Sequence, residues 1–225
     1  PQDRSSAASD VYKRQIEGTI SKTFALLGLV SIAALASYSI VVQTPALTSL
    51  MIVGGSIGGL VLALSIIFIR PNNPQVLMSM YALMQGLFVG SFSYMIEEFY
   101  LGGKEGVILQ ALVGTVAVFF TMLGIYRMGL IRPTEKFVIF VSSIAGAIMI
   151  VYVMNFLLSF AGVGIPFLHS SGPIGIGISV VFLTVAALFL IVDFGMIENG
   201  AKYGAPKNME WYGAFGLVMT LIWLY

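Results

Sequence analysis

The sequence contains no cysteine and only one histidine, His169, among its 225 residues. The lack of cysteine excludes disulfides, thiolate nucleophiles and zinc sites of the cysteine type. A single histidine also makes a histidine-based metal cluster hard to assemble. His169 stands beside Ser170 and Ser171, but adjacent positions in a loop do not supply the geometry that a base and its nucleophile need. We therefore expect a protein that is not an enzyme and that carries no cofactor.

Charge is scarce as well, because only 9% of the residues are charged whereas 58% are hydrophobic. Soluble domains carry about 25% charged residues, so the composition indicates an integral membrane protein. The formal net charge of +1 gives no indication of a nucleic-acid partner. The partner that the composition favours is the lipid bilayer.

Long apolar runs fill most of the chain. A helix needs about 20 apolar residues to cross about 30 Å of hydrocarbon, and six runs have that length: 23–42, 48–69, 76–96, 106–126, 137–160 and 176–195. A seventh begins near Trp211 and still continues at Tyr225, so we expect a truncated seventh helix. The sequence thus predicts an all-α polytopic protein, with a disordered polar tail over 1–22 and a single seven-helix transmembrane domain over 23–225.

The basic residues predict the orientation, because cytoplasmic loops carry an excess of lysine and arginine. All but one of them fall on the same side of the predicted spans: Arg4, Lys13, Arg14, Lys22, Arg70, Arg127, Arg132, Lys136, Lys202 and Lys207. The opposite loops hold only Lys104, beside acidic residues. The N-terminus is therefore predicted to be cytoplasmic, and the sixth helix to end on the cytoplasmic side.

Asp193 is the candidate functional residue, because it follows an uncharged run over 176–192. An ionised carboxylate at a helix centre in the bilayer costs about 2.5–3.5 kcal/mol, and such residues usually mark function. Glu198 lies five positions later, about 140° away around a helix, so a carboxylate partner for Asp193 must come from another helix. Two close carboxylates would share protons, and oxygen-rich acidic sites suit calcium. The alternative is that Asp193 simply ends its helix and meets water.

Other polar residues each have two interpretations. Arg70 is either a partner of Asp193 that holds a cytoplasmic gate shut or a positively charged anchor at a helix end. Glu198 is either a second functional acid or, as we expect, a loop acid that faces Lys202. Gln85 and Asn155 either line a hydrated path or hydrogen-bond across helices. Glu97 and Glu98 begin an acidic loop that either concentrates cations or is simply solvated. Closely spaced glycines either pack helices within one bundle or form a dimer seam; the pairs are Gly54/Gly58, Gly55/Gly59 and Gly86/Gly90.

Four segments resemble the Bax inhibitor family, also called the transmembrane Bax-inhibitor-motif family. They are LIVDFGMIE (190–198), GAPKNMEWYGAFGLVMTLIWLY (204–225), GIYRMGLIR (124–132) and IPFLHSSGP (165–173). The last two are similar to a bacterial branch of that family. The likeness covers nearly all of 18–225, and the order and spacing of the segments make it specific. It implies a multi-pass protein of the bacterial plasma membrane.

The resemblance also implies seven helices with the last one central, and a calcium leak pathway that is sensitive to pH. Family members carry one acid at the end of the sixth helix and one within the seventh, which share protons and control closure. Asp193 matches the first acid, and the second would follow shortly after Tyr225. Arg70 falls near a family arginine proposed to engage the acids, although a proline-rich turn follows it here in place of a more basic run.

We therefore expect a pH-sensitive calcium leak channel whose partners are calcium and protons. Asp193 would be its proton-sensing gate and a calcium ligand, and Arg70 a gate partner. One alternative is a proton-coupled transporter of a small solute, with Asp193 as the proton carrier. The other is a non-transporting membrane regulator that binds a protein partner through its loops.

Overall fold

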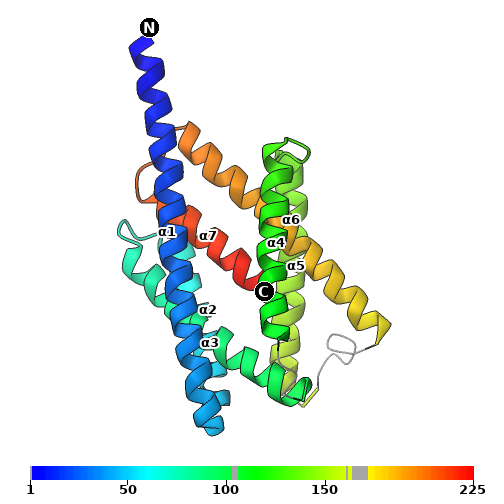
Figure 1. The fold of residues 1–225 in the computed structure, drawn as a ribbon. Coiled ribbons are helices and arrows are strands. Elements are labelled where there is room, and N and C mark those ends of the chain that lie inside the picture. Colours follow the sequence, from blue (N-terminus) through cyan, green and yellow to red (C-terminus); the bar gives the residue numbers. More distant parts are fainter. Residues whose placement is uncertain (1, 103–105, 161, 164–171) are drawn as a thin grey trace. The chain divides into compact units, whose positions relative to one another are not determined.

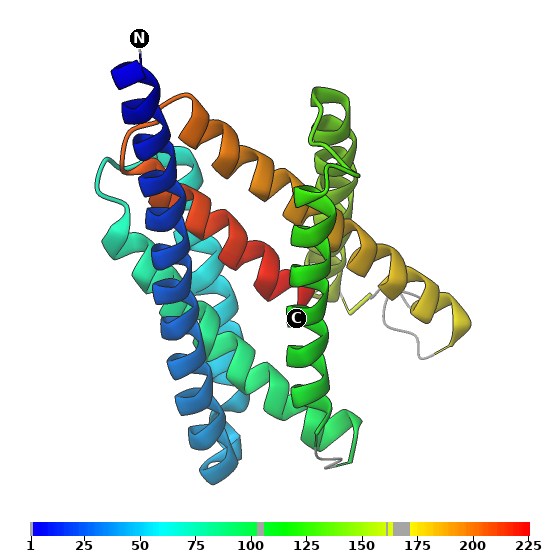
Figure 2. The ribbon, with the colours of Figure 1, turned by 45° about the horizontal axis from the view of Figure 1, so that its top comes forward.

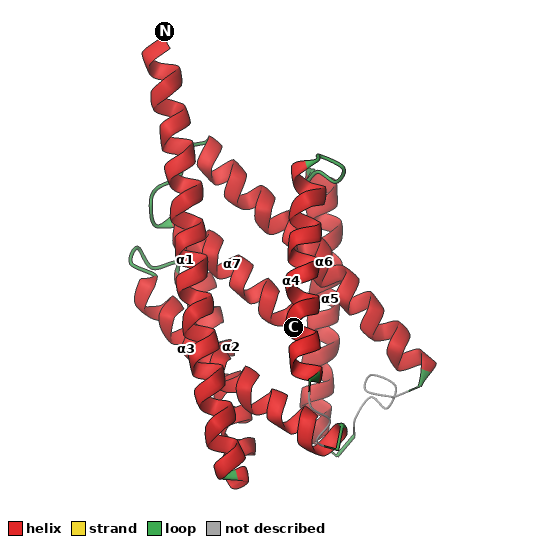
Figure 3. Cartoon of the chain, in the orientation of Figure 1, coloured by secondary structure: helices red, strands yellow, loops and turns green. Residues whose placement is uncertain are grey.

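The structure, a computed structural model, describes residues 2–102, 106–160, 162–163 and 172–225. Within these ranges the regular elements are helices and no strand occurs (Figure 3). In chain order the elements are α1 Gln2–Gln43, the 3₁₀ turn η1 Pro45–Leu47, α2 Thr48–Ile69, α3 Gln75–Met95, the π-helical turn η2 Ile96–Tyr100, α4 Val107–Arg127, α5 Glu135–Phe160, α6 Pro173–Lys202 and α7 Met209–Leu224.

The apolar runs of the sequence became helices because the bilayer offers a backbone no other hydrogen-bond partner. Among the described residues, six helical segments are long and apolar enough to cross a membrane: Ser9–Gln43, Pro45–Ile69, Gln75–Phe99, Val107–Arg127, Glu135–Asn155 and Pro173–Lys202. The apolar helix α7 is shorter, with 16 residues. The all-α class and the multi-pass membrane character are therefore confirmed, while the seventh span and the orientation stay predictions.

Helix α1 begins at Gln2, so it runs through the segment 1–22 that the sequence predicts to be a disordered tail. Polar side chains in this part of α1 have partners elsewhere in the chain. Gln15 donates a hydrogen bond from Nε2 to the carbonyl oxygen of Ala205, and Lys22 forms an ion pair with Glu210. These polar contacts stabilise a helix in a segment whose sequence has no apolar periodicity from which a helix could be predicted.

The chain divides into two compact units. Unit 1 contains 1–115, 196–223 and 225, and unit 2 contains 116–195 and 224. Unit 1 therefore holds α1, α2 and α3 complete, nearly all of α7 and the C-terminal turns of α6. Unit 2 holds α5, the C-terminal part of α4 and most of α6, including Asp193.

Four helices of unit 1 share one hydrophobic core, and α7 (red) lies beside α1 (blue) in both ribbon views (Figures 1 and 2). The rings of Tyr81 and Phe215 meet edge to face with their centroids 4.9 Å apart, which joins α3 to α7. The buried members of this core are Leu26, Val30, Ala63, Ile66, Met78, Tyr81, Ala82, Ala214, Phe215 and Val218.

Glycines allow α3 to approach its neighbours closely. A Cβ atom at Gly55 would come within 2.7 Å of the backbone nitrogen of Phe88, so α2 and α3 meet there. A Cβ atom at Gly90 would overlap the carbonyl oxygen of Ala34 in α1, whereas one at Gly54 would meet nothing within 4 Å. At Gly55 and Gly90, the predicted close packing therefore occurs within the bundle.

A buried pair of serines links α1 to α3. Ser37 is 0% exposed, and its Oγ lies 2.5 Å from Ser91 Oγ and 2.8 Å from the carbonyl oxygen of Leu87. Hydrogen bonds between membrane helices contribute about 0.6 kcal/mol on average and up to about 1.7 kcal/mol. We expect Ser37→Ala to lower the free energy of unfolding by about 1 kcal/mol, measured by equilibrium unfolding in mixed micelles.

Ser39 provides the control for this substitution, because it is exposed and its Oγ donates a hydrogen bond to the carbonyl oxygen of Leu35 within its own helix. Ser39→Ala should leave the free energy of unfolding unchanged. Equal effects of the two substitutions would show that the contact between Ser37 and Ser91 contributes nothing.

Candidate functional site

Asp193 lies inside helix α6 and is buried, with 2% of its surface exposed. Nearby on the same helix, Leu190 and Ile191 are 0% exposed and Phe194 is 7% exposed, while Val192 is half-buried. The helix continues for nine residues after Asp193, to Lys202. The alternative that Asp193 ends its helix and meets water is therefore wrong.

The polar residues after Asp193 extend the helix instead of ending it. Glu198 and Lys202 are one helical turn apart and form an ion pair of 2.6 Å between Oε1 and Nζ, which supports a helix. The prediction of a helix end near 195, with Glu198 in a loop, is wrong, but the predicted partnership with Lys202 is confirmed.

The actual end of α6 is a Schellman motif. Gly204 has φ of +64°, the N–H of Ala205 donates to the carbonyl oxygen of Gly200 at 2.9 Å, and the N–H of Gly204 donates to that of Ala201 at 3.4 Å. Glycine adopts this left-handed conformation without a steric cost. The sequence carries a readable indication of this end, because Gly204 is followed by Pro206.

Within unit 2, aromatic and proline contacts set the position of α6 around Asp193. The ring of Phe194 packs against Phe119, with centroids 5.7 Å apart, and against Tyr126, with centroids 5.6 Å apart. A Cβ atom at Gly195 would overlap the ring of Pro133. Contacts from the residues next to Asp193 therefore fix the rotation and the depth of α6 against α4 and the loop that follows α4.

Arg70 closes helix α2 in a left-handed backbone conformation, with φ of 46°. Its N–H donates to the carbonyl oxygen of Ile66 at 3.2 Å, and its side chain is exposed. Arg70 belongs to unit 1 and Asp193 to unit 2. Their pairing therefore stays a prediction, as does the role of Arg70 as an anchor.

Among the described residues, no group of three His, Cys, Asp or Glu side chains gathers where it could hold a metal ion. Calcium takes 6–8 oxygen ligands, and Asp193 offers at most two. Any calcium at Asp193 would therefore need further oxygen ligands from water or carbonyl groups.

The other sequence candidates are placed as follows. Glu97 and Glu98 lie in the π-helical turn η2 that continues α3, rather than in a loop, and Tyr38 donates a hydrogen bond of 2.8 Å to Glu97 Oε2. Gln85 and Asn155 lie inside α3 and α5 as predicted. Three candidates lie outside the described residues: His169, Ser170 and Ser171.

One ion pair was not foreseen from the sequence. Lys22 of α1 pairs with Glu210 of α7, and their side chains are 16% and 9% exposed. From the sequence, Lys22 counts only among the basic residues that predict the orientation, and Glu210 is not singled out. An indication was available, because opposite charges stand at the start of the first and the seventh apolar runs. Only the packing of α1 against α7 shows that they meet.

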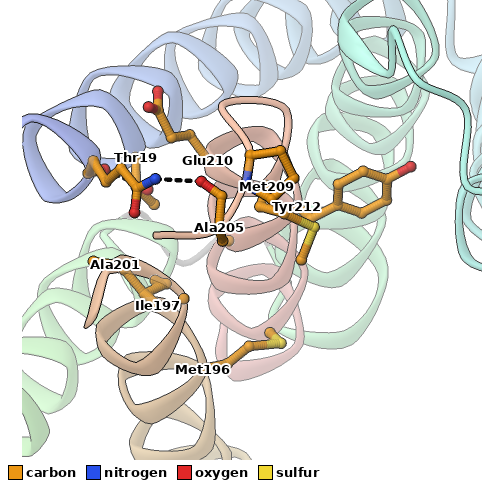
Figure 4. A pocket seen from close by; sticks show the side chains of 12 residues that line it. Thr19, Met196, Ile197, Ala201, Ala205, Met209, Glu210 and Tyr212 are labelled. Atoms are coloured by element: carbon orange, nitrogen blue, oxygen red, sulfur yellow. Dashed lines mark hydrogen bonds between the residues drawn. The ribbon is translucent and has the colours of Figure 1, made fainter. Parts of the chain in front are cut away.

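A cavity of about 40 Å³ lies beside this ion pair, within unit 1 (Figure 4). A water molecule needs roughly 10–15 Å³ of such space, so the cavity has room for about three. We call it the α1–α7 cavity, and it is lined by Gln15, Thr19, Met196, Ile197, Gly200, Ala201, Ala205, Pro206, Met209, Glu210, Tyr212 and Gly213.

Comparison with known proteins gives one result. A family model described as Bax inhibitor 1 like matches residues 2–225. No curated protein and no solved structure matches the chain significantly. The family match spans both compact units and includes Asp193, Arg70 and the ion pair between Lys22 and Glu210.

Proposed function

Because the chain belongs to the Bax inhibitor 1 like family, we propose that it is a pH-sensitive calcium leak channel gated by Asp193. The observation that supports this most directly is an acid that is 2% exposed inside an apolar helix. An ionised acid in the bilayer is costly, and acids in this setting mark the paths of ions and protons. A residue that exchanges one for the other suits a pH-dependent cation path.

The proposal includes a topology. Helix α7 would contribute the seventh span that the family resemblance implies; its 16 residues cover about 24 Å at 1.5 Å per residue, which is less than the hydrocarbon thickness of about 30 Å. The N-terminus would be cytoplasmic, because of the distribution of lysine and arginine. Asp193 would then lie in the cytoplasmic half of α6, and the membrane would be the plasma membrane of a bacterium.

The sign of the pH dependence follows from the charge of Asp193. When the carboxyl group is ionised, it attracts calcium and the path conducts. When the carboxyl group is protonated, it is neutral, the attraction is lost and the path closes. Calcium flux should therefore rise with pH. In this mechanism Arg70 acts as a gate partner, because its guanidinium group would compete with calcium for the carboxylate.

The test is calcium flux into proteoliposomes between about pH 6 and pH 8, the range in which the pKa of a buried carboxyl group can fall. Flux through the unmodified protein should increase across this range. Asp193→Asn should remove the pH dependence, because an amide does not titrate, and Asp193→Glu should keep it. Glu198→Gln is the control, since it removes an acid of the same helix that pairs with Lys202.

Other outcomes decide between functions. An unchanged pH profile for Asp193→Asn would refute the role of Asp193. Solute uptake that depends on a proton gradient, without calcium flux, would favour the transporter. Capture of a membrane protein partner that survives Asp193→Asn, again without flux, would favour the regulator.

A further inference from the structure

The ion pair between Lys22 and Glu210 joins helices that are far apart in the sequence. Lys22 Nζ contacts Glu210 Oε2 and also lies over the ring of Trp211, 5.5 Å from its centroid. Both charged side chains are largely buried. Removing one partner of a buried pair leaves an uncompensated charge, which is strongly destabilising. The contact between α1 and the first turn of α7 therefore depends on both charges.

Two glycines bring the backbones close enough for this pair. A Cβ atom at Gly18 would overlap the carboxylate of Glu210, so that carboxylate lies directly against the backbone of α1. A Cβ atom at Gly213 would come within 2.9 Å of Ile197 Cγ1 and 3.1 Å of Thr19 Cγ2. The last turns of α6, the first turns of α7 and α1 are thus in contact at one place.

The α1–α7 cavity lies beside this contact, is lined in part by polar atoms and has room for water. Gln15 uses its Nε2 on the carbonyl oxygen of Ala205, drawn as a dashed line in Figure 4, while its Oε1 is buried without a hydrogen-bond partner. A buried acceptor of this kind is normally satisfied by water, and the cavity has room for about three water molecules. Water there would reach both Gln15 Oε1 and the side of Glu210 that lines the cavity.

We propose that Lys22 and Glu210 form a hydrated ion-pair latch, which holds the start of α7 and the end of α6 against α1 and which can open. Water in the α1–α7 cavity lowers the cost of separating the two charges, because each can be solvated as the pair opens. When the latch opens, the first turn of α7 and Trp211 leave α1 together. The contact of Ile197 and Gly213 is released at the same time.

The latch also offers a connection to Asp193, because Ile197 lies one helical turn after Asp193 on α6. Opening of the latch would free the segment of α6 that follows the acid. This connection rests on the proposed function, whereas the latch itself does not. The two can therefore fail independently.

Trp211 serves as the reporter of the latch. The sequence has only two tryptophans, and Trp223→Phe leaves Trp211 as the single fluorophore of the full chain. In this background Lys22→Met and Glu210→Gln should each shift the emission of Trp211 to longer wavelength and increase its quenching by acrylamide. The exchanged variant Lys22→Glu with Glu210→Lys should restore both towards the original values.

A double-mutant cycle measures the strength of the latch. Unfolding in mixed micelles should give a coupling between positions 22 and 210 of about tenfold in the equilibrium constant. The matched control is Glu198→Gln with Lys202→Met, which removes a more exposed ion pair near the end of α6 and should leave the fluorescence of Trp211 unchanged.

The outcomes separate the alternatives. Unchanged quenching of Trp211 in both single variants, or a coupling below about twofold, would overturn the latch. If the single variants do not fold, recovery of folded protein by the charge exchange supports the latch and failure of the exchange overturns it. Latch variants that change Trp211 but leave the pH profile of calcium flux intact would remove the connection to Asp193 alone.

Discussion

Gly90→Ala is expected to lower the free energy of unfolding by about 3 kcal/mol or more, at the upper end of what overpacking costs. The new Cβ atom would overlap the carbonyl oxygen of Ala34 and lie 2.8 Å from its carbonyl carbon. These are backbone atoms of α1, so no side chain can move aside to make room. Relief requires α1 to shift away from α3, which would also separate Ser37 from Ser91.

Thermal unfolding in detergent would measure this effect, with Gly54→Ala as the control. Gly54 also lies inside a helix and belongs to a predicted glycine pair, but a Cβ atom there meets nothing within 4 Å. Gly54→Ala should leave the melting temperature unchanged or raise it slightly, because alanine is the better helix former. A melting temperature of Gly90→Ala equal to that of Gly54→Ala would mean that α1 and α3 are further apart than described.

The sequence could predict the helices because the bilayer interior both favours apolar side chains and offers the backbone no hydrogen-bond partner. Inside a bilayer an apolar run has to be helical, and every predicted run overlaps one helix, most of whose ends lie within a few residues of the prediction. Larger differences occur where helices leave the apolar range. Helix α1 continues back to Gln2 and α6 continues to Lys202, because hydropathy reports contact with lipid and not the hydrogen bonds of polar turns.

The glycine pairs show what the spacing of residues in the sequence can predict about helix packing and what it cannot. The pattern predicted close packing but did not distinguish Gly54 from Gly55, because which side of α2 meets α3 depends on the rotation of the helix. That rotation is set by the whole core of unit 1. Which of the two glycines packs closely is therefore determined by the tertiary structure.

For the site, the sequence could single out Asp193 as a candidate, because one acid in an apolar run is visible from the sequence alone. The pair of Lys22 and Glu210 was missed because 188 positions separate its members and nothing local joins them. In the sequence, each of the two is simply a charged residue at the start of an apolar run. Detecting the pair required knowing that α1 and α7 are neighbours.

Gly195→Ala is the second substitution with a large expected effect, because it changes the position of Asp193 without changing its charge. The new Cβ atom would overlap Pro133 Cγ and lie 2.9 Å from Pro133 Cβ. The proline ring cannot rotate away as a flexible side chain would, so α6 or the loop after α4 has to move. We expect a loss of about 1–3 kcal/mol in the free energy of unfolding, measured by thermal unfolding in detergent.

Gly177→Ala is the matched control in the same helix, because a Cβ atom at Gly177 meets nothing within 4 Å. It should leave both stability and calcium flux unchanged. For Gly195→Ala, a shifted α6 would move the carboxyl group of Asp193, two residues earlier, so flux should change while its pH dependence persists. In Gly195→Ala the titrating group is still present but displaced, so the expected result differs from that of Asp193→Asn, for which we expect the pH dependence to be lost. A stability of Gly195→Ala equal to that of Gly177→Ala would show that Pro133 does not hold α6 beside the acid.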